Sequence, residues 1–595
     1  MSDFVCWLHP SQALEAGTPW PGGSCGPRLG DGGCGIAGGT AVAEDGLLAA
    51  ITGHPRWPDA ATAELASRRG DASAALAARR RHGDDFPNRL GGDYALVIAD
   101  PGAGRLLAAI DRFGQAALYY APLRGGVVVA TRRPLLSGHP DAPSAIDPQS
   151  IHDYLYFHMI PAPDTLYTGM GKLPGAHRLR VRGAELAVER YWTPAFSEAP
   201  VDETALGDEL RETLGDAVER GMDADATGSF LSGGLDSSTV TGLHAARAPG
   251  RAHAYSIGFD VPGYDEMEYA RLAARHFDVP LSEYYAAPAD IADTVEAVVR
   301  AYDEPFGNSS ALPAYLCARM AKQEGMTRLL AGDGGDELFA GNARYAKQGL
   351  FEQYYRLPRA LRAGLFEPVF LGPAGRLPGL RKGRSYIEQA LIPLPDRTET
   401  YNFLHRIDPE AVFEPDFLAA VNRGHPLEHL RRLYSVPDDA GTLNRMLYLD
   451  WRITLADNDL RKVTGACRLA GIDVTFPMLD DDVVALSCRI PSASKLQRGA
   501  LRRFYKQTFR GFLPDEVIDK RKHGFGLPFG IWLRDDRRLH ELAQDMLRKV
   551  RSHGWVRGAF IDELMDVHLR DHPSYYGDFV WVLMALGIWL DQRDP

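Results

Sequence analysis

The sequence is poor in the features that mark secreted, zinc-binding or membrane-spanning proteins. Its 595 residues contain no CxxC pair and no histidine cluster at zinc spacing. The six cysteines are scattered: Cys6, Cys25, Cys34, Cys317, Cys467 and Cys488. The first residues lack a basic-then-apolar signal pattern, and no apolar run approaches the roughly 20 residues that span a bilayer. We therefore expect reduced thiols, no membrane contact and a cytoplasmic location.

An excess of positive charge is also missing. The chain has 66 Lys and Arg against 78 Asp and Glu, a formal charge of -12, so its overall field repels phosphate backbones and anionic surfaces. The basic run at residues 79–81 is more typical of the solvated end of a helix than of a nucleic-acid patch. We predict that the protein does not bind nucleic acid.

The length and composition predict two globular α/β domains, at residues 1–197 and 198–595. Hydrophobic residues make up 45% of the chain and charged residues 24%, as in ordinary globular proteins. Residues 4–133 read as short β-rich runs divided by Gly and Asp turns, interrupted by an Ala-rich helix at about 60–81. A turn-prone stretch at 194–201 marks the expected boundary.

Beyond that boundary, apolar β runs alternate with helical patterns, for example at residues 229–231, 254–259 and 328–331. Such alternation predicts a parallel sheet with helices on both faces. After about Tyr345 the chain reads as mostly helical. An apolar stripe near the end predicts a core helix rather than a ligand site, and it comprises Phe579, Leu583, Leu586 and Leu590.

The strongest chemical signal is the segment FLSGGLDSS at residues 230–238, placed between a β run and a helix. A strand, a glycine turn and a helix start direct several backbone N–H groups and the helix dipole toward one point, which suits a pyrophosphate. Glycine and serine also occur in ordinary helix caps, but five fixed residues in this order would arise by chance in about one such chain in a thousand. The segment lacks the Gly-Lys-Ser/Thr ending of a Walker A loop, so transfer of the γ-phosphate is not favoured.

This segment resembles the ATP-pyrophosphatase domain of the asparagine synthetase family, and further blocks follow in the family's order. The matching segments are Ser256-Ile-Gly-Phe259, Asp265-Glu266 with Tyr269-Ala-Arg271, Asp303-Glu-Pro-Phe306, the block at residues 331–341, Phe476-Pro-Met-Leu-Asp480 and Arg521-Lys-His-Gly-Phe525. The resemblance covers nearly the whole chain. It implies an Ntn-hydrolase-like αββα sandwich, then a doubly wound parallel-sheet ATP-pyrophosphatase domain with a helical C-terminal part.

The resemblance also implies the site residues and the cofactors ATP and Mg²⁺. Asp236 and Asp336 would hold Mg²⁺ on the phosphates, and Lys522 would stabilise the negative charge that develops during adenylation. The residues expected to bind ATP are Leu231, Ser232, Gly233, Gly234, Asp236, Ser237, Ser256, Ile257, Gly258, Gly332, Gly334 and Lys462.

Two parts of the chain depart from the family pattern. Family members begin Met-Cys-Gly-Ile, with the cysteine as the glutaminase nucleophile, whereas this chain has Ser2 there and lacks the glutamine-holding blocks. Two readings retain a hydrolase role: Ser2 acts as the nucleophile, or Cys34-Gly-Ile-Ala-Gly38 is a displaced start. The more economical interpretation is a glutaminase-like fold without glutaminase chemistry.

The second departure lies near the acceptor. The family's Glu-x-Arg-x-Pro is Asp473-Val-Thr-Phe-Pro477 here, and the acidic position before the Gly-x-Asp block is Asp333. A small aspartate substrate needs such an arginine for its carboxylate. Asp333 and Asp473 are the residues expected to orient or deprotonate an amine.

Relatives without the N-terminal cysteine include β-lactam synthetases and lasso-peptide cyclases, which close an amide inside one substrate. The β-lactam enzymes lack much of the helical region at residues 345–450, so a peptide macrolactam is the first hypothesis. Its expected partners are a peptide or small-molecule carboxylate substrate, a leader-peptide-binding protein and a precursor protease. The alternatives are an asparagine-type ligase using ammonia, a β-lactam-type cyclase and, least favoured, a nucleotide-binding pseudoenzyme.

Overall fold

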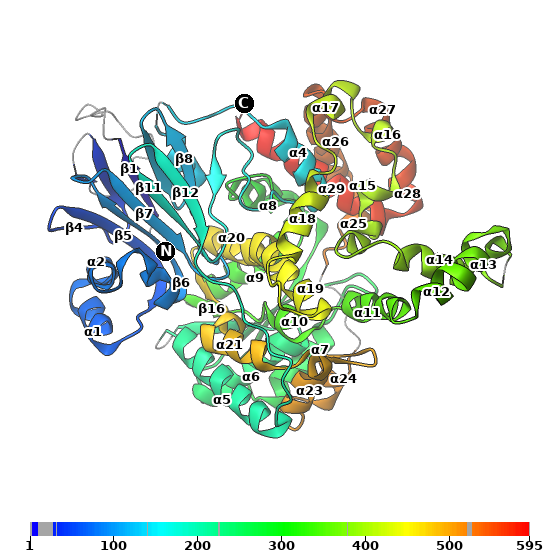
Figure 1. The fold of residues 1–595 in the computed structure, drawn as a ribbon, viewed down its shortest axis with the longest axis horizontal. Coiled ribbons are helices and arrows are strands. Elements are labelled where there is room, and N and C mark those ends of the chain that lie inside the picture. Colours follow the sequence, from blue (N-terminus) through cyan, green and yellow to red (C-terminus); the bar gives the residue numbers. More distant parts are fainter. Residues whose placement is uncertain are drawn as a thin grey trace.

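The structure, a computed structural model, describes residues 3–9, 28–30, 33–139, 141–223, 226–377, 379–520 and 526–593. Two six-stranded antiparallel sheets form its N-terminal part (Figure 1). The first sheet has the order β10 (Gly171–Lys172), β8 (Tyr119–Leu123), β9 (Gly126–Ala130), β1 (Phe4–Leu8), β3 (Cys34–Gly38) and β2 (Arg28–Gly30). The second has the order β12 (Glu185–Arg190), β11 (His177–Arg182), β7 (Arg105–Ile110), β6 (Gly91–Asp100), β5 (Leu47–Arg56) and β4 (Val42–Glu44).

The two sheets pack face to face because their strands alternate between two apolar layers. On β1, Phe4 and Cys6 point into the core between the sheets, while Val5 and Trp7 point outward to a helical layer. That layer contains α3 (Arg133–Leu136) and α4 (Pro148–Phe157), and α2 (Asp71–His82) covers the other sheet. The predicted αββα sandwich is therefore confirmed.

The Ala-rich helix differs from its prediction. The structure divides residues 60–81 between α1 (Ala60–Arg69) and α2, with Gly70 between them at φ +86°. Glycine adopts this left-handed conformation without a steric penalty, and Asp71 begins the next helix. The Arg79–Arg81 run lies in the last turn of α2, as expected.

A five-stranded parallel sheet forms the centre of the second domain. Its order is β15 (Leu281–Ala286), β14 (Ala254–Phe259), β13 (Thr227–Phe230), β16 (Arg328–Leu330) and β17 (Asp473–Thr475). The neighbouring residues Leu329 and Leu330 are both 0% exposed. Successive side chains point to opposite faces of a strand, so both faces are covered, as in a doubly wound fold.

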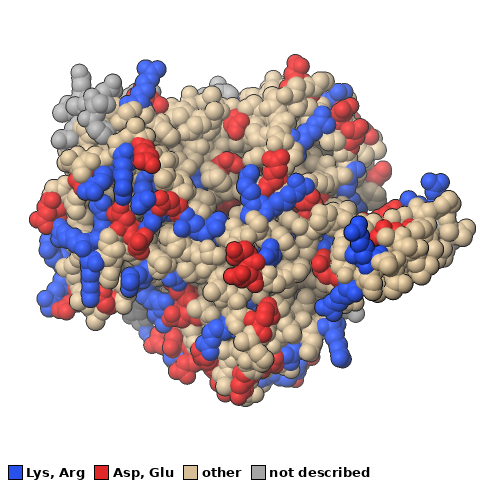
Figure 2. All heavy atoms as spheres, viewed as in Figure 1, with Lys and Arg blue, Asp and Glu red and all other residues tan. Residues whose placement is uncertain are grey.

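The remainder is mostly helical, as predicted. The apolar stripe lies on α29 (Pro573–Arg593), where Phe579, Leu583, Leu586 and Leu590 are at most 2% exposed. Three short helices, α12 (Arg359–Leu361), α13 (Glu367–Leu371) and α14 (Arg381–Ala390), project from one side of the molecule (Figure 1). On the face drawn in Figure 2, basic and acidic side chains are interspersed.

The Asp303-Glu304 block joins the two domains. Arg132 of the N-terminal part pairs with Asp303 at 2.6 Å, and Lys172 pairs with Glu304 at 2.7 Å. The backbone N–H of Leu166 also donates to Glu304 Oε1 at 2.7 Å. Residues 191–202, which contain the predicted boundary at 197/198, form neither helix nor strand, and the boundary itself stays a prediction. In the described part of the chain, no helix has the length and apolar character needed to cross a membrane.

Candidate active site

The FLSGGLDSS segment forms a tight turn at the carboxyl end of β13, directly before α6 (Leu235–Arg247). Ser237 Oγ accepts a hydrogen bond from the backbone N–H of Ser232 at 3.2 Å and lies 3.1 Å from Ser232 Oγ. Ser232 Oγ also accepts from the N–H of Gly234 at 3.3 Å. The two hydroxyl groups thus fix the shape of the turn and leave the start of α6 facing the sheet edge, as an anion-binding loop requires.

Two glycines allow three chain segments to meet around this turn. Gly233 has φ +69°, and a Cβ there would lie 2.5 Å from the backbone N of Ala270. A Cβ on Gly335 would lie 2.1 Å from Asp236 Oδ1. The loop after β16 therefore packs directly against the acidic residue of the first motif.

Asp236 and Asp336, the two expected metal ligands, converge on one arginine. Arg502 donates from Nη1 and Nη2 to the two carboxylate oxygens of Asp236 at 2.7 and 2.6 Å, and it also pairs with Asp336. Arg502 is 5% exposed, and its two acidic neighbours raise its pKa against the opposing effect of burial. Arg502 was not singled out from the sequence, because no motif there distinguishes it from other arginines.

Asp333 and Lys462, two of the expected site residues, lie close to each other. Lys462 Nζ is 3.7 Å from Asp333 Oδ1 and donates to Asp459 Oδ1 at 3.0 Å. Burial raises the pKa of Asp333 to about 6, against the opposing effect of Lys462. The pKa of Lys462 is raised by Asp459 and Asp333 in spite of its burial. A carboxyl group that titrates near neutrality is suited to accept a proton from an amine.

The strand register places Ser256, Ile257 and Gly258 beside the turn. Phe230, the last residue of β13, pairs with Tyr255 of β14, so residues 256–258 extend past it along the sheet edge. Leu231 is held there by its N–H, which donates to the carbonyl of Tyr255 at 2.9 Å. The loop residues Gly332 and Gly334 follow β16 at the same edge, and a Cβ on Gly332 would lie 2.7 Å from Ser237 N.

Asp473 is not part of this cluster. It begins β17 and pairs in register with Arg328, the first residue of β16, so it lies at the amino end of the sheet. Its carboxylate contacts His54 Nε2 at 3.1 Å and Arg328 Nη2 at 3.2 Å. His54 and Arg328 hold the pKa of Asp473 at about 2 despite partial burial. Hydrogen bonds to Asp473 and Asp93 raise the pKa of His54 to about 9. We therefore correct its predicted role: Asp473 joins the domains and does not face the reacting groups.

Lys522 lies outside the described residues. Lys520, which precedes that segment, is anchored beside the turn: its Nζ is 2.9 Å from Glu266 Oε1 and 3.4 Å from the carbonyl oxygen of Gly233, to which it donates. Lys520 itself therefore lies next to the FLSGGLDSS segment. Lys520 was not singled out from the sequence, where a Lys-Arg-Lys run gives no reason to prefer its first member.

The thiols of Cys6 and Cys34 are buried within the first sheet. Cys34 pairs with Leu8 between β3 and β1 and is 2% exposed, and Cys6 is fully buried beside it. Burial, reinforced by Cys34, raises the pKa of Cys6 well above its usual value. Each described cysteine is buried, and Ser2 lies outside the described residues. The displaced start at Cys34 is thus an internal strand of a sheet.

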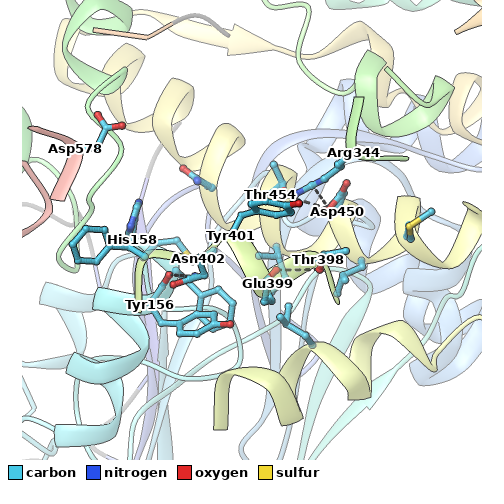
Figure 3. Close-up of a pocket in the computed structure, with 18 of the residues that line it drawn as sticks. Tyr156, His158, Arg344, Thr398, Glu399, Tyr401, Asn402, Asp450, Thr454 and Asp578 are labelled. Atoms are coloured by element: carbon cyan, nitrogen blue, oxygen red, sulfur yellow. Dashed lines mark hydrogen bonds and ion pairs between the residues drawn. The ribbon is translucent and has the colours of Figure 1, made fainter. Parts of the chain in front are cut away.

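A cavity of about 340 Å³ lies between α4 and the helical part (Figure 3). Seven Phe and Tyr residues line it: Tyr156, Phe157, Tyr345, Tyr401, Phe403, Tyr575 and Phe579. Asp450 and Arg344 form an ion pair in its wall, and Glu399 and Asp578 are further acidic residues of the lining. This cavity was not predicted from the sequence, because its walls come from segments that are distant in the chain.

Comparisons with known proteins agree with this architecture. The family profile described as Asparagine synthase matches residues 209–591, and that described as Glutamine amidotransferase domain matches residues 60–192. Asparagine synthetase [glutamine-hydrolyzing] 1 of Bacillus subtilis is 25% identical over 523 residues, covering 87% of this chain and 80% of the relative. A putative asparagine synthetase [glutamine-hydrolyzing] of Mycobacterium bovis is 26% identical over 541 residues, covering 87% and 79%.

Proposed function

This chain belongs to the asparagine synthase family, and we propose that within it the protein closes an amide inside a peptide substrate rather than making asparagine. The broader class is an ATP-dependent carbon-nitrogen ligase. In the proposed reaction a carboxylate oxygen of the substrate attacks the α-phosphorus of ATP, and pyrophosphate leaves. The amine nitrogen then attacks the acyl carbon of the adenylate, AMP leaves, and the amine loses a proton.

The observation that carries the proposal is the cavity between α4 and the helical C-terminal part. Water occupies about 30 Å³ per molecule, so a cavity of about 340 Å³ has the volume of about eleven waters. Ammonia, which is as small as water, does not need such a space, whereas pockets for organic ligands begin near 300 Å³. The buried position of Cys34 agrees with an amine supplied by the substrate rather than by glutamine hydrolysis.

The residues of the chain take the following roles in this proposal. The turn at residues 232–237 and the start of α6 bind the pyrophosphate part of ATP, and residues 256–258 border the adenine. Asp333 accepts the proton of the attacking amine, and Lys462 holds Asp333 in place. Lys522 stabilises the negative charge that develops at the α-phosphate and in the tetrahedral adduct.

Magnesium fits the carboxylate pair by donor chemistry. Asp236 and Asp336 already share one cationic partner, so their oxygens converge on one point, as hard oxygen ligands of Mg²⁺ must. When bound there, the ion would neutralise phosphate charge, and it would take the place of Arg502 as the partner of both carboxylates. Arg502 thus keeps the acidic pair neutralised in its absence.

Product analysis tests the proposal. With ATP and a leader-free peptide carrying an Asp or Glu, we expect AMP, pyrophosphate and a peptide lighter by one water without a free N-terminus. Effective concentration within one folded peptide favours ring closure over attack by external amines. Asparagine formed from free aspartate and ammonia, with the peptide unchanged, would instead support the second candidate, which the names of the relatives favour. A leader-peptide-binding protein and a precursor protease remain proposed partners of the first.

A further inference from the structure

The acidic groups that line the cavity between α4 and the helical C-terminal part differ in whether a cation neutralises them. Asp450 is neutralised by Arg344 and accepts a hydrogen bond from Tyr345. Glu399 accepts a hydrogen bond from Thr398 Oγ1 at 3.1 Å, and within the described residues neither Glu399 nor Asp578 forms an ion pair with Lys, Arg or His. The cavity therefore carries an excess of negative charge.

The remaining charged candidates near the cavity do not cancel this excess. Burial lowers the pKa of His158 to about 4, so its imidazole is neutral near pH 7. Lys347 keeps its positive charge beside Tyr401, whose ring centroid lies 4.1 Å from its Nζ, so it can offset only one of the two unpaired carboxylates. In Figure 3 Asp578 and His158 lie at one side of the cavity, and Arg344 with Asp450 lies at the other.

Aromatic rings line the same cavity as these carboxylates. Tyr156, Tyr401 and Phe579 present ring surface to the same space, and aromatic faces attract cations within about 6 Å of the ring centroid. Carboxylates and rings together form an environment suited to an ammonium group attached to an apolar or aromatic body. A neutral or anionic ligand would leave both carboxylates without a cationic partner in the cavity.

The chain segment that lines one edge of the cavity continues into the cluster of the proposed proton acceptor. Asn458 lines the cavity, and the next residue, Asp459, accepts the hydrogen bond of Lys462, which pairs with Asp333. Asn308 holds Asn458 in place with a hydrogen bond of 2.7 Å.

We propose that this cavity binds the amine-bearing end of the substrate, a protonated N-terminal ammonium with an aromatic or apolar side chain close to it. This inference rests on the proposed function and names the part of the peptide that the protein recognises. Glu399 and Asp578 bind the ammonium before reaction, and the aromatic walls take the neighbouring side chain. The wall from α4 gives the N-terminal domain a role in substrate binding.

Direct binding to the full-length protein without nucleotide tests the inference. The probes are the tripeptide amide Gly-Phe-Leu-NH₂ and its N-acetylated form, which has the same shape but no ammonium. We expect the free amine to bind at least about tenfold more tightly in calorimetric titrations, since a partly desolvated ammonium gains from both carboxylates and rings. Equal affinities of the two probes, or no binding of either at millimolar concentration, would overturn the inference.

Substitutions locate the site within the protein. Glu399→Gln and Asp578→Asn should each weaken binding of the free amine by about five- to tenfold and leave the acetylated probe unchanged. Glu410→Gln, the same change at an exposed position of α16 (Pro409–Val412), is the matched control and should alter neither. If Glu399→Gln and Asp578→Asn behave like Glu410→Gln, the ammonium does not bind in this cavity.

The result separates the two proposals. Amine-dependent binding that responds to Glu399 and Asp578, without AMP formation from any peptide, would remove the proposed function and keep the binding site. Macrolactam formation that is unaffected by both substitutions would keep the function and remove the site. In neither case does the failure of one proposal decide the other.

Discussion

Replacing Arg502 by glutamine should make the stability of the protein depend on magnesium. The substitution removes the cation that Asp236 and Asp336 share and leaves two carboxylates facing each other. Loss of one partner from a buried pair costs about 3–5 kcal/mol, but the side chains of Asp236 and Asp336 are 18% and 21% exposed. Solvent screening therefore reduces the expected loss to about 2–3 kcal/mol.

The expected change in melting temperature can be worked out from that loss of stability. Unfolding entropy of about 2.1 cal/mol/K per residue over a domain of about 400 residues makes 1 kcal/mol worth about 1.2 °C. Arg502→Gln should therefore lower the melting temperature by about 2–4 °C in a magnesium-free buffer. Saturating MgCl₂ should restore most of this loss in the variant, because the ion supplies the missing charge and binds only the folded state.

Arg538→Gln serves as the control for this prediction. Arg538→Gln breaks an exposed pair with Asp293, both partners of which are at least 60% exposed, and should change the melting temperature by less than 1 °C, since such pairs contribute about 0–1 kcal/mol. Scanning calorimetry with and without MgCl₂ compares the three proteins. An equal response to magnesium in the wild type and in Arg502→Gln would refute the view that Arg502 and the ion share one set of ligands.

Four further outcomes are expected. Asp236→Asn should keep the fold by circular dichroism but lose most pyrophosphate release, and chromatography of the wild-type reaction should show AMP; ADP would contradict cleavage at the α-phosphate. Lys522→Ala should keep ATP binding and lose turnover by about a hundredfold in single-turnover assays, whereas unchanged turnover would exclude it from the chemistry. The rate should rise with pH through about 6, as Asp333 loses its proton, and Asp333→Asn should abolish that limb; a limb that persists belongs to another group. Asp473→Asn should retain turnover but lower the melting temperature, and a loss of turnover in a protein of unchanged stability would restore its catalytic assignment. Because the folded pKa of His54 is about 9 against an ordinary 6.5, the stabilisation from this contact is complete below about pH 6.5 and is lost as the pH rises through 9.

The sequence predicted the fold well because its patterns were local. The apolar β runs at residues 254–259 and 328–331, separated by helical patterns, predicted a parallel sheet, and the structure places β14 and β16 in one. The glycine turn of residues 232–237 required only a strand before it and a helix after it. The break at Gly70 was missed because alanine and arginine on both sides favour helix strongly, and a single glycine costs only about 1 kcal/mol.

The site was predicted less completely because several of its members meet only in three dimensions. Asp333 and Lys462 are 129 positions apart in the chain, and the resemblance to a family supplied what spacing alone did not. Arg502 had no such guide, and its importance appears only through its two acidic partners. Asp473 was misplaced because its position next to a conspicuous Phe-Pro turn does not reveal which end of the strand faces the nucleotide loop.

The contacts of the N-terminal domain with the second domain give it a structural role. Its Cys34 is buried in β3, an internal strand of the first sheet. The domain is joined to the second by Arg132–Asp303 and Lys172–Glu304, each with an acidic partner at most 8% exposed, and losing either cation would leave a buried charge. Tyr156 and His158, at the end of α4, line the proposed amine cavity. The N-terminal domain is thus held in place by buried charge pairs with the second domain, and it forms part of the cavity wall.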